Sequence, residues 1–219
     1  MTRPRSLPAL LALIPRPATG SASDAGSGPD GNSRLTSVTG MVLLVLLAVE
    51  GCTLLDVRGL IGPHVFVGTL LAGPLLVKVA STTYRFGRYY LRSEAYVHRG
   101  PPLPLLRLLG PVVTISSVAV IGSGLGLLAV ERGGLLLTLH KGSFIVWFAV
   151  MVVHVLGHLW EAAIGSWREL RRRTIGQLAR LTVLVFSLLA GAAVAVAVLP
   201  SAAPWHHRPA GAREHHRLR

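Results

Sequence analysis

Several ionisable side chains stand inside long apolar stretches of the sequence, where such groups are expensive to bury and usually functional. They are Glu50, His64, Lys78, His140, His154 and His158. His64 precedes Lys78 by 14 residues, and His140 precedes His154 by the same interval. Because 14 residues complete about four helical turns, the two members of each pair share one helix face and lie about 21 Å apart.

The matched intervals indicate a cofactor held between two helices. The stretches that carry His64 and His140 are expected to cross the bilayer in the same direction. These two imidazoles should therefore lie at one depth near the outer surface, with Lys78 level with His154 near the inner surface. Two imidazoles at one depth on two helices are what a six-coordinate haem iron requires. The sequence thus predicts a haem b whose axial ligands are His64 and His140.

Small and basic residues could complete this haem site. Gly68 follows His64 by one turn, and a glycine-rich part of the third stretch contributes Gly122, Ser123, Gly124 and Gly126. Small residues would let helix backbones approach the edge of a porphyrin, although they also serve ordinary helix packing. Arg58 and Lys141 could neutralise haem propionates, and contact with lipid headgroups is the alternative.

The inner pair allows several interpretations. Lys78 either extends to the inner headgroups or, if neutral, ligates iron. His154 is either the ligand of a second haem or a hydrogen-bonding histidine. His154, His158 and Glu161 also follow the i, i+4, i+7 spacing of a divalent metal site. Glu50 is a candidate for proton handling, or a neutral acid that is hydrogen-bonded to a neighbour.

The composition indicates an integral membrane protein. Of 219 residues, 51% are hydrophobic and only 14% charged, against roughly 25% in soluble proteins. This excludes an ordinary soluble enzyme, and the single cysteine excludes a disulfide framework and Cys-based metal centres. The net charge of +13 is spread over loops that anionic lipid headgroups would contact, which argues against nucleic-acid binding.

Five apolar stretches supply the elements that position these residues. A bilayer crossing needs roughly 20 residues, and in lipid each must be a helix. We therefore predict an all-α integral membrane helical bundle, with a four-helix haem-binding core over residues 38–160 and a fifth transmembrane helix over 181–199. The predicted spans are Val38–Leu55, Leu60–Ala80, Leu108–Val130, Leu139–Leu159 and Leu181–Leu199.

The remaining segments are expected to lie outside the bilayer. Residues 1–37 contain a Gly/Ser/Asp/Pro run and are predicted to be disordered, and 200–219 form a His/Arg-rich tail without structure. Arginines gather in the link between spans two and three and in the basic loop over 161–180. By the positive-inside rule, this multi-pass protein of the cell membrane has a cytoplasmic N-terminus and an external C-terminus.

Three segments, Gly62–Gly68, Leu139–Phe148 and Val153–His158, carry a resemblance to a known group. The chain resembles the small b-type transmembrane cytochromes, the cytochrome b561-like and ferric-reductase-like group, over roughly residues 36–160. The resemblance implies a four-helix bundle with His64 and His140 as axial ligands and His154 as a ligand of a second haem. Lys78 departs from the group's histidine pattern, which leaves the second haem open.

These observations predict a membrane cytochrome that carries electrons through bis-histidine haem, as an electron-transfer subunit of an oxidoreductase system. Its expected partners are membrane lipid, a quinol or quinone, and a redox partner protein. No NAD or flavin fingerprint occurs in the sequence, so such chemistry would need another protein. The alternatives are a non-redox transporter or metal-ion carrier that uses intramembrane His and Glu, and a membrane scaffold.

Overall fold

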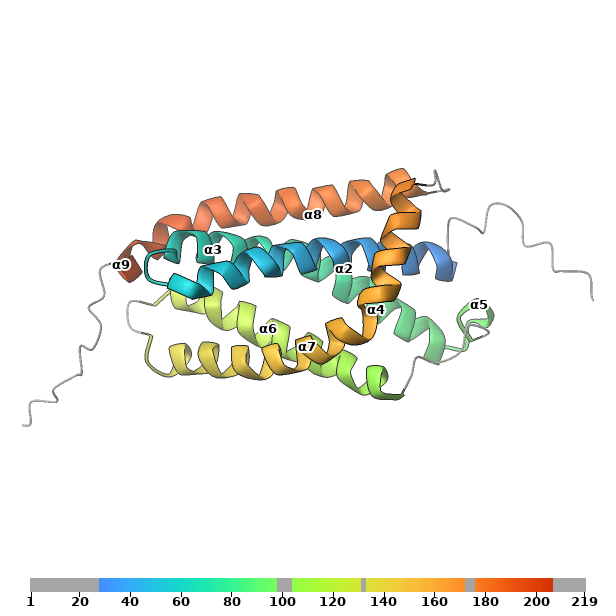
Figure 1. The fold of residues 1–219 in the computed structure, drawn as a ribbon, viewed down its shortest axis with the longest axis horizontal. Coiled ribbons are helices and arrows are strands. Elements are labelled where there is room, and N and C mark those ends of the chain that lie inside the picture. Colours follow the sequence, from blue (N-terminus) through green and yellow to red (C-terminus); the bar gives the residue numbers. More distant parts are fainter. Residues whose placement is uncertain (1–27, 98–103, 131–132, 172–175, 207–219) are drawn as a thin grey trace, which may run out of the picture.

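The computed structural model describes residues 28–97, 104–130, 133–171 and 176–206. Within these ranges every regular element is a helix (Figure 1). Five helical segments are long and apolar enough to cross a membrane, which confirms the predicted all-α bundle. They are Gly28–Asp56, Ile61–Tyr90, Leu109–Leu128, Gly134–Trp160 and Gln177–Trp205.

The first span is α2 (Gly28–Thr53), continued by the short 3₁₀ helix η1 (Leu54–Asp56). The Asp56 carboxylate accepts a 3.0 Å hydrogen bond from the Gly59 backbone N–H, which closes the tight turn into the second span. The first two spans therefore form a hairpin.

The beginning of α2 corrects one prediction. Residues 28–37 are helical rather than disordered, and residues 1–27 lie outside the described part of the chain. Gly31 is buried, and the Asn32 side-chain amide donates to the Ser81 carbonyl oxygen over 3.0 Å. Packing against the second span therefore overrides the weak helix propensity of this glycine- and serine-rich segment.

The second span consists of α3 (Ile61–Leu70) and α4 (Ala72–Tyr90), with a turn at Leu71, and the short α5 (Glu94–Val97) follows. Pro74 has no N–H to donate to the Leu70 carbonyl, four residues earlier, so one hydrogen bond of the helix is missing here. The interruption separates the half that carries His64 from the half that carries Lys78.

α6 (Pro104–Leu128) and α7 (Gly134–Arg171) form an antiparallel pair. The later part of α7 turns away from α6 and passes across α2 towards the start of α8 (Figure 1). There, a methyl group on Gly165 would lie 3.0 Å from the Ser37 hydroxyl, which shows how closely the two helices approach. Residues 161–171 therefore continue α7 as a helix, which corrects the predicted loop over 161–180. Residues 172–175 lie outside the described ranges.

The fifth span is α8 (Gln177–Val198), followed by η2 (Leu199–Ala202) and α9 (Ala203–His206). α8 lies along α3 and α4 (Figure 1). A methyl group on Gly191 would lie 2.7 Å from the freed Leu70 carbonyl oxygen, and one on Gly73 would collide with the Ser187 carbonyl oxygen. Glycines thus allow backbone-to-backbone contact at the interruption of the second span.

The tail prediction is wrong for residues 200–206, because these continue into helical turns that cap the bundle. Ala202 is buried there, so the segment packs rather than extending into solvent. Residues 207–219 lie outside the described ranges. The His64 end is the end of the bundle at which α3 and α7 begin. The Glu169 end is the opposite end, at which α7 ends and α8 begins.

Candidate functional site

His64 and Glu50 meet at the hairpin between the first two spans. His64 lies in the first turn of α3 and Glu50 in the last turn of α2. The His64 Nδ1 atom is 2.7 Å from Glu50 Oε1, and the side chains are 20% and 15% exposed. Glu50 Oε2 is buried without a hydrogen-bond partner. Glu50, the candidate for proton handling, is thus paired with His64.

Thr53 fixes which nitrogen of His64 carries the proton. The Thr53 hydroxyl donates to the Glu50 carbonyl oxygen at 2.6 Å, so its oxygen is left to accept from His64 Nδ1 at 3.0 Å. Both Nδ1 contacts therefore favour an Nδ1–H donor, and the neutral ring keeps its lone pair on Nε2. A carboxylate that accepts from a histidine in this way orients the ring and raises its basicity as a ligand.

His140 lies in the second turn of α7 and is oriented by α6. Its Nδ1 atom is 3.0 Å from the Val120 carbonyl oxygen and 3.2 Å from the Ser123 hydroxyl. A carbonyl oxygen can only accept, so Nδ1 must be the protonated nitrogen. Neutral His140 therefore also carries its lone pair on Nε2. Backbone carbonyls commonly hold metal-binding histidines in this tautomer.

The structure brings these two histidines together from two different spans. Their ring centroids are 6.4 Å apart and the ring planes are inclined by 79°. Among the described residues, no hydrogen bond involves Nε2 of either ring. A metal ion about 2.0 Å from each of two facing nitrogens would give a centroid separation of roughly 6.4 Å. The observed separation therefore suits a metal held between the two rings.

The glycines near the histidines have different roles. A methyl group on Gly68 would lie 3.3 Å from Glu50 Oε1, and one on Gly124 would lie 3.0 Å from His140 Cε1. A methyl group on Gly122 would have no neighbouring atom within 4 Å. Of the small residues that the sequence indicated in this span, Gly124 is therefore the one on which the His140 ring rests.

Arg58 and Lys141 both lie at the His64 end and are exposed. Arg58 is in the turn between η1 and α3, and Lys141 directly follows His140 in α7. Neither has a hydrogen bond or an ion pair with another described residue. Both cations are thus available to an anionic group at this end of the bundle.

Lys78 and His154, which the sequence places at one depth, have different surroundings from His64 and His140. The Lys78 ammonium donates to the Thr36 carbonyl oxygen on α2 at 2.8 Å. The His154 ring centroid is 4.9 Å from that of His158, and His154 Nδ1 is buried without a partner. The Glu161 side chain lies outside the described part, within which no three His, Cys, Asp or Glu side chains could hold a metal ion together.

A buried ion-pair cluster at the Glu169 end was not predicted. The Glu169 side chain, on α7, is only 1% exposed. Arg180 of α8 donates to its Oε1 atom through Nε at 2.8 Å and through Nη2, and Arg34 of α2 approaches Oε2 at 3.6 Å. In the sequence Glu169 stands among arginines and has no apolar periodicity that would indicate burial.

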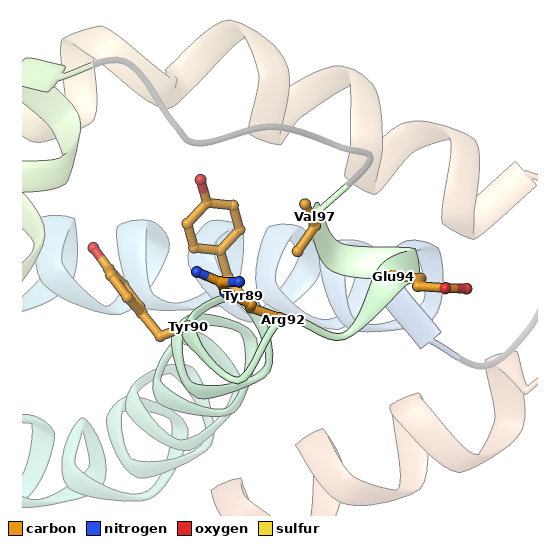
Figure 2. A pocket seen from close by; sticks show the side chains of 5 residues that line it. All are labelled: Tyr89, Tyr90, Arg92, Glu94 and Val97. Atoms are coloured by element: carbon orange, nitrogen blue, oxygen red, sulfur yellow. The ribbon is translucent and has the colours of Figure 1, made fainter.

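A surface pocket of about 440 Å³ lies where α4 turns into α5 (Figure 2). It is lined by Tyr89, Tyr90, Arg92, Glu94 and Val97. Arg92 has a left-handed backbone, with φ of 56°, which allows the chain to reverse between the two helices. Because α4 ends at the Glu169 end, this pocket is separate from the histidine pair.

Comparison with known proteins identifies no relative: no family model matches the chain, and neither a curated protein nor a solved structure is significantly similar to it.

Proposed function

We propose that this chain is a membrane b-type cytochrome in which His64 and His140 hold the iron of one haem b. The observation that carries the proposal is the matched state of the two rings. Each presents Nδ1–H to an acceptor of the protein and leaves its Nε2 lone pair free, and the centroids are 6.4 Å apart. These tautomers and this separation support two axial histidine ligands on one iron.

When bound, the haem would supply one-electron chemistry, and the protein would supply ligation and tuning of the potential. Glu50 would orient His64 and make it the stronger electron donor of the two ligands. The Val120 carbonyl would hold His140 in the required tautomer, and Gly124 would leave room for its ring. Arg58 and Lys141 would neutralise propionates at the His64 end. Lys78 contacts α2, so the proposal includes no haem at its level.

The site's place at one end of the bundle supports exchange of electrons with a quinol or a redox partner protein rather than transfer across the whole bilayer. From the positive-inside rule, we infer a cytoplasmic N-terminus and a C-terminus outside the cell membrane. The His64 end would then face outwards, and the Glu169 end inwards.

The haem content of the purified protein tests the proposal. The chain in detergent should be red, reducible and low-spin, with about one haem per chain. His64→Ala and His140→Ala should each remove most of the haem, whereas the matched variant His158→Ala should retain it. A folded, colourless wild-type protein after expression with ample haem would refute the proposal. Bound divalent metal that His158→Ala removes would instead support a metal-ion carrier.

A further inference from the structure

The surface pocket between α4 and α5 is lined by charges of both signs (Figure 2). Arg92 and Glu94 both line it, and both residues are exposed. Within the described part of the chain, neither side chain has a hydrogen bond or an ion pair. In Figure 2 the Arg92 side chain points towards Tyr89 and Tyr90, and the Glu94 carboxylate points away from it. The two charges therefore remain separate, and both are accessible to a ligand.

Arg92 has a backbone conformation that glycine usually supplies. Its φ of 56° is left-handed, which strains a residue with a Cβ atom, and a glycine commonly ends a helix in this conformation. The Arg92 backbone N–H donates to the Tyr89 carbonyl oxygen at 3.1 Å, and the Ser93 N–H donates to the Arg88 carbonyl oxygen at 3.0 Å. These bonds hold the strained turn, so the arginine side chain is kept at the pocket although glycine would suit the backbone better.

Side-chain contacts between α4 and α5 form the pocket in advance of any ligand. Arg88 donates from Nη2 to the Ser93 hydroxyl at 3.0 Å and lies over the Tyr96 ring, 5.9 Å from its centroid. Tyr96 is only 6% exposed, and its ring packs edge-on against Tyr84 with the centroids 6.2 Å apart. These contacts hold α5 against the end of α4. The volume of about 440 Å³ is within the range of sites for small molecules.

The pocket lies where the second span reaches its end. The apolar segment of this span ends at Tyr90, and tyrosines are enriched where helices leave the hydrocarbon region of a membrane. Leu76 is 69% exposed and Tyr90 49% exposed, and their interval of 14 residues places them on one face of α4. Ala80 and Thr83, between them on this face, are also exposed. The face offers an acyl chain a continuous surface from the middle of the span to the pocket.

We propose that this pocket binds the headgroup of a phospholipid that carries a primary ammonium group, as phosphatidylethanolamine does. The Arg92 guanidinium binds the phosphate, which it matches with several N–H donors. The Glu94 carboxylate accepts hydrogen bonds from the ammonium group. A purely anionic headgroup leaves this carboxylate without a cation, and a trimethylated ammonium group has no N–H to donate to it. The site does not depend on the proposed haem.

Thermal unfolding of the full chain in detergent tests the proposal, with phosphatidylethanolamine, phosphatidylcholine or phosphatidylglycerol of the same acyl chains added. A ligand that binds only the folded state raises the unfolding temperature as its concentration rises. Phosphatidylethanolamine should give the largest rise in wild-type protein. Its water-soluble headgroup, glycerophosphoethanolamine, should give little rise, because it lacks the acyl chains that cover α4. Equal rises with the three lipids, or an equal rise with the soluble headgroup, would overturn the proposal.

Arg92→Gly removes the guanidinium and also relieves the left-handed strain. Without added lipid, this variant should therefore unfold at a temperature no lower than that of wild type. Loss of hydrogen bonds to a charged group should raise the half-saturating concentration of phosphatidylethanolamine about tenfold. Arg168→Gln is the matched control, since Arg168 is exposed at the Glu169 end but does not line the pocket, and its lipid response should be that of wild type.

Glu94→Lys tests the second charge of the pocket. The new cation repels an ammonium group and attracts a phosphate, so the preference should change from phosphatidylethanolamine to phosphatidylglycerol. A wild-type lipid response in Arg92→Gly would contradict the proposed site. If that variant does not fold, an unchanged preference for phosphatidylethanolamine in Glu94→Lys overturns the proposal as well.

Discussion

The buried carboxylate of Glu169 offers a prediction that can be worked out from the structure. Glu169→Gln keeps the shape of the side chain but removes the negative charge that Arg180 contacts twice. The two side chains are 1% and 10% exposed, so water screens the pair little. Arg34 is 3.6 Å away and 35% exposed, so its contribution should be small.

Removing one partner of such a buried ion pair costs about 3–5 kcal/mol. For a chain of this size, that corresponds to a fall in unfolding temperature of roughly 6–20 °C. Because the amide of glutamine still accepts one hydrogen bond, we expect the lower half of this range. The exposed carboxylate Glu94 gives the matched control, and Glu94→Gln should change the unfolding free energy by less than about 0.5 kcal/mol.

Equilibrium unfolding in detergent measures both variants, and a double variant separates charge from packing. Replacing Glu169 and Arg180 together by leucine should restore most of the stability that either single replacement loses, since no isolated charge is left behind. A Glu169→Gln protein within about 1 kcal/mol of wild type would refute the reasoning. It would mean that the ion pair does not fix α8 to the end of α7.

Three further predictions concern the bundle and the histidine pair. Gly191→Val should lower the free energy of unfolding by about 1–3 kcal/mol, because the Leu70 backbone carbonyl cannot move away from the added side chain. In the same equilibrium unfolding measurement, Val at the exposed position Ala193 should leave the free energy unchanged. Gly124→Ala should lower haem occupancy by displacing the His140 ring. Gly122→Ala, whose methyl group meets open space, should leave the haem spectrum unchanged. Equal haem spectra for the two variants would contradict the proposed haem site. Thr53→Val should cost about 1–3 kcal/mol through loss of the hydroxyl that bonds both Glu50 and His64, and no loss in denaturant titration would show that this hydroxyl does not fix the ring.

The five spans could be predicted from hydropathy because the bilayer requires a long apolar helix for each crossing. The approach of His64 to His140 followed from matched positions on two parallel crossings. These features depend on local pattern and on direction through the membrane, both of which the sequence contains.

Other features depend on tertiary contacts that no local pattern reveals. The start of α2 at Gly28 requires packing of Gly31 and Asn32 on the second span. Burial of Glu169 requires that α7 bend across α2 towards Arg180. The tautomers of the two histidines depend on the Val120 carbonyl and the Thr53 hydroxyl, groups that are too common in sequences to be recognised as partners.

The interruption at Leu71 divides the second span into two helices, α3 and α4. Each half has its own polar contact with α2: in α3, His64 contacts Glu50, and in α4, Lys78 contacts Thr36. Loss of one of these contacts with α2 therefore leaves the other contact in place.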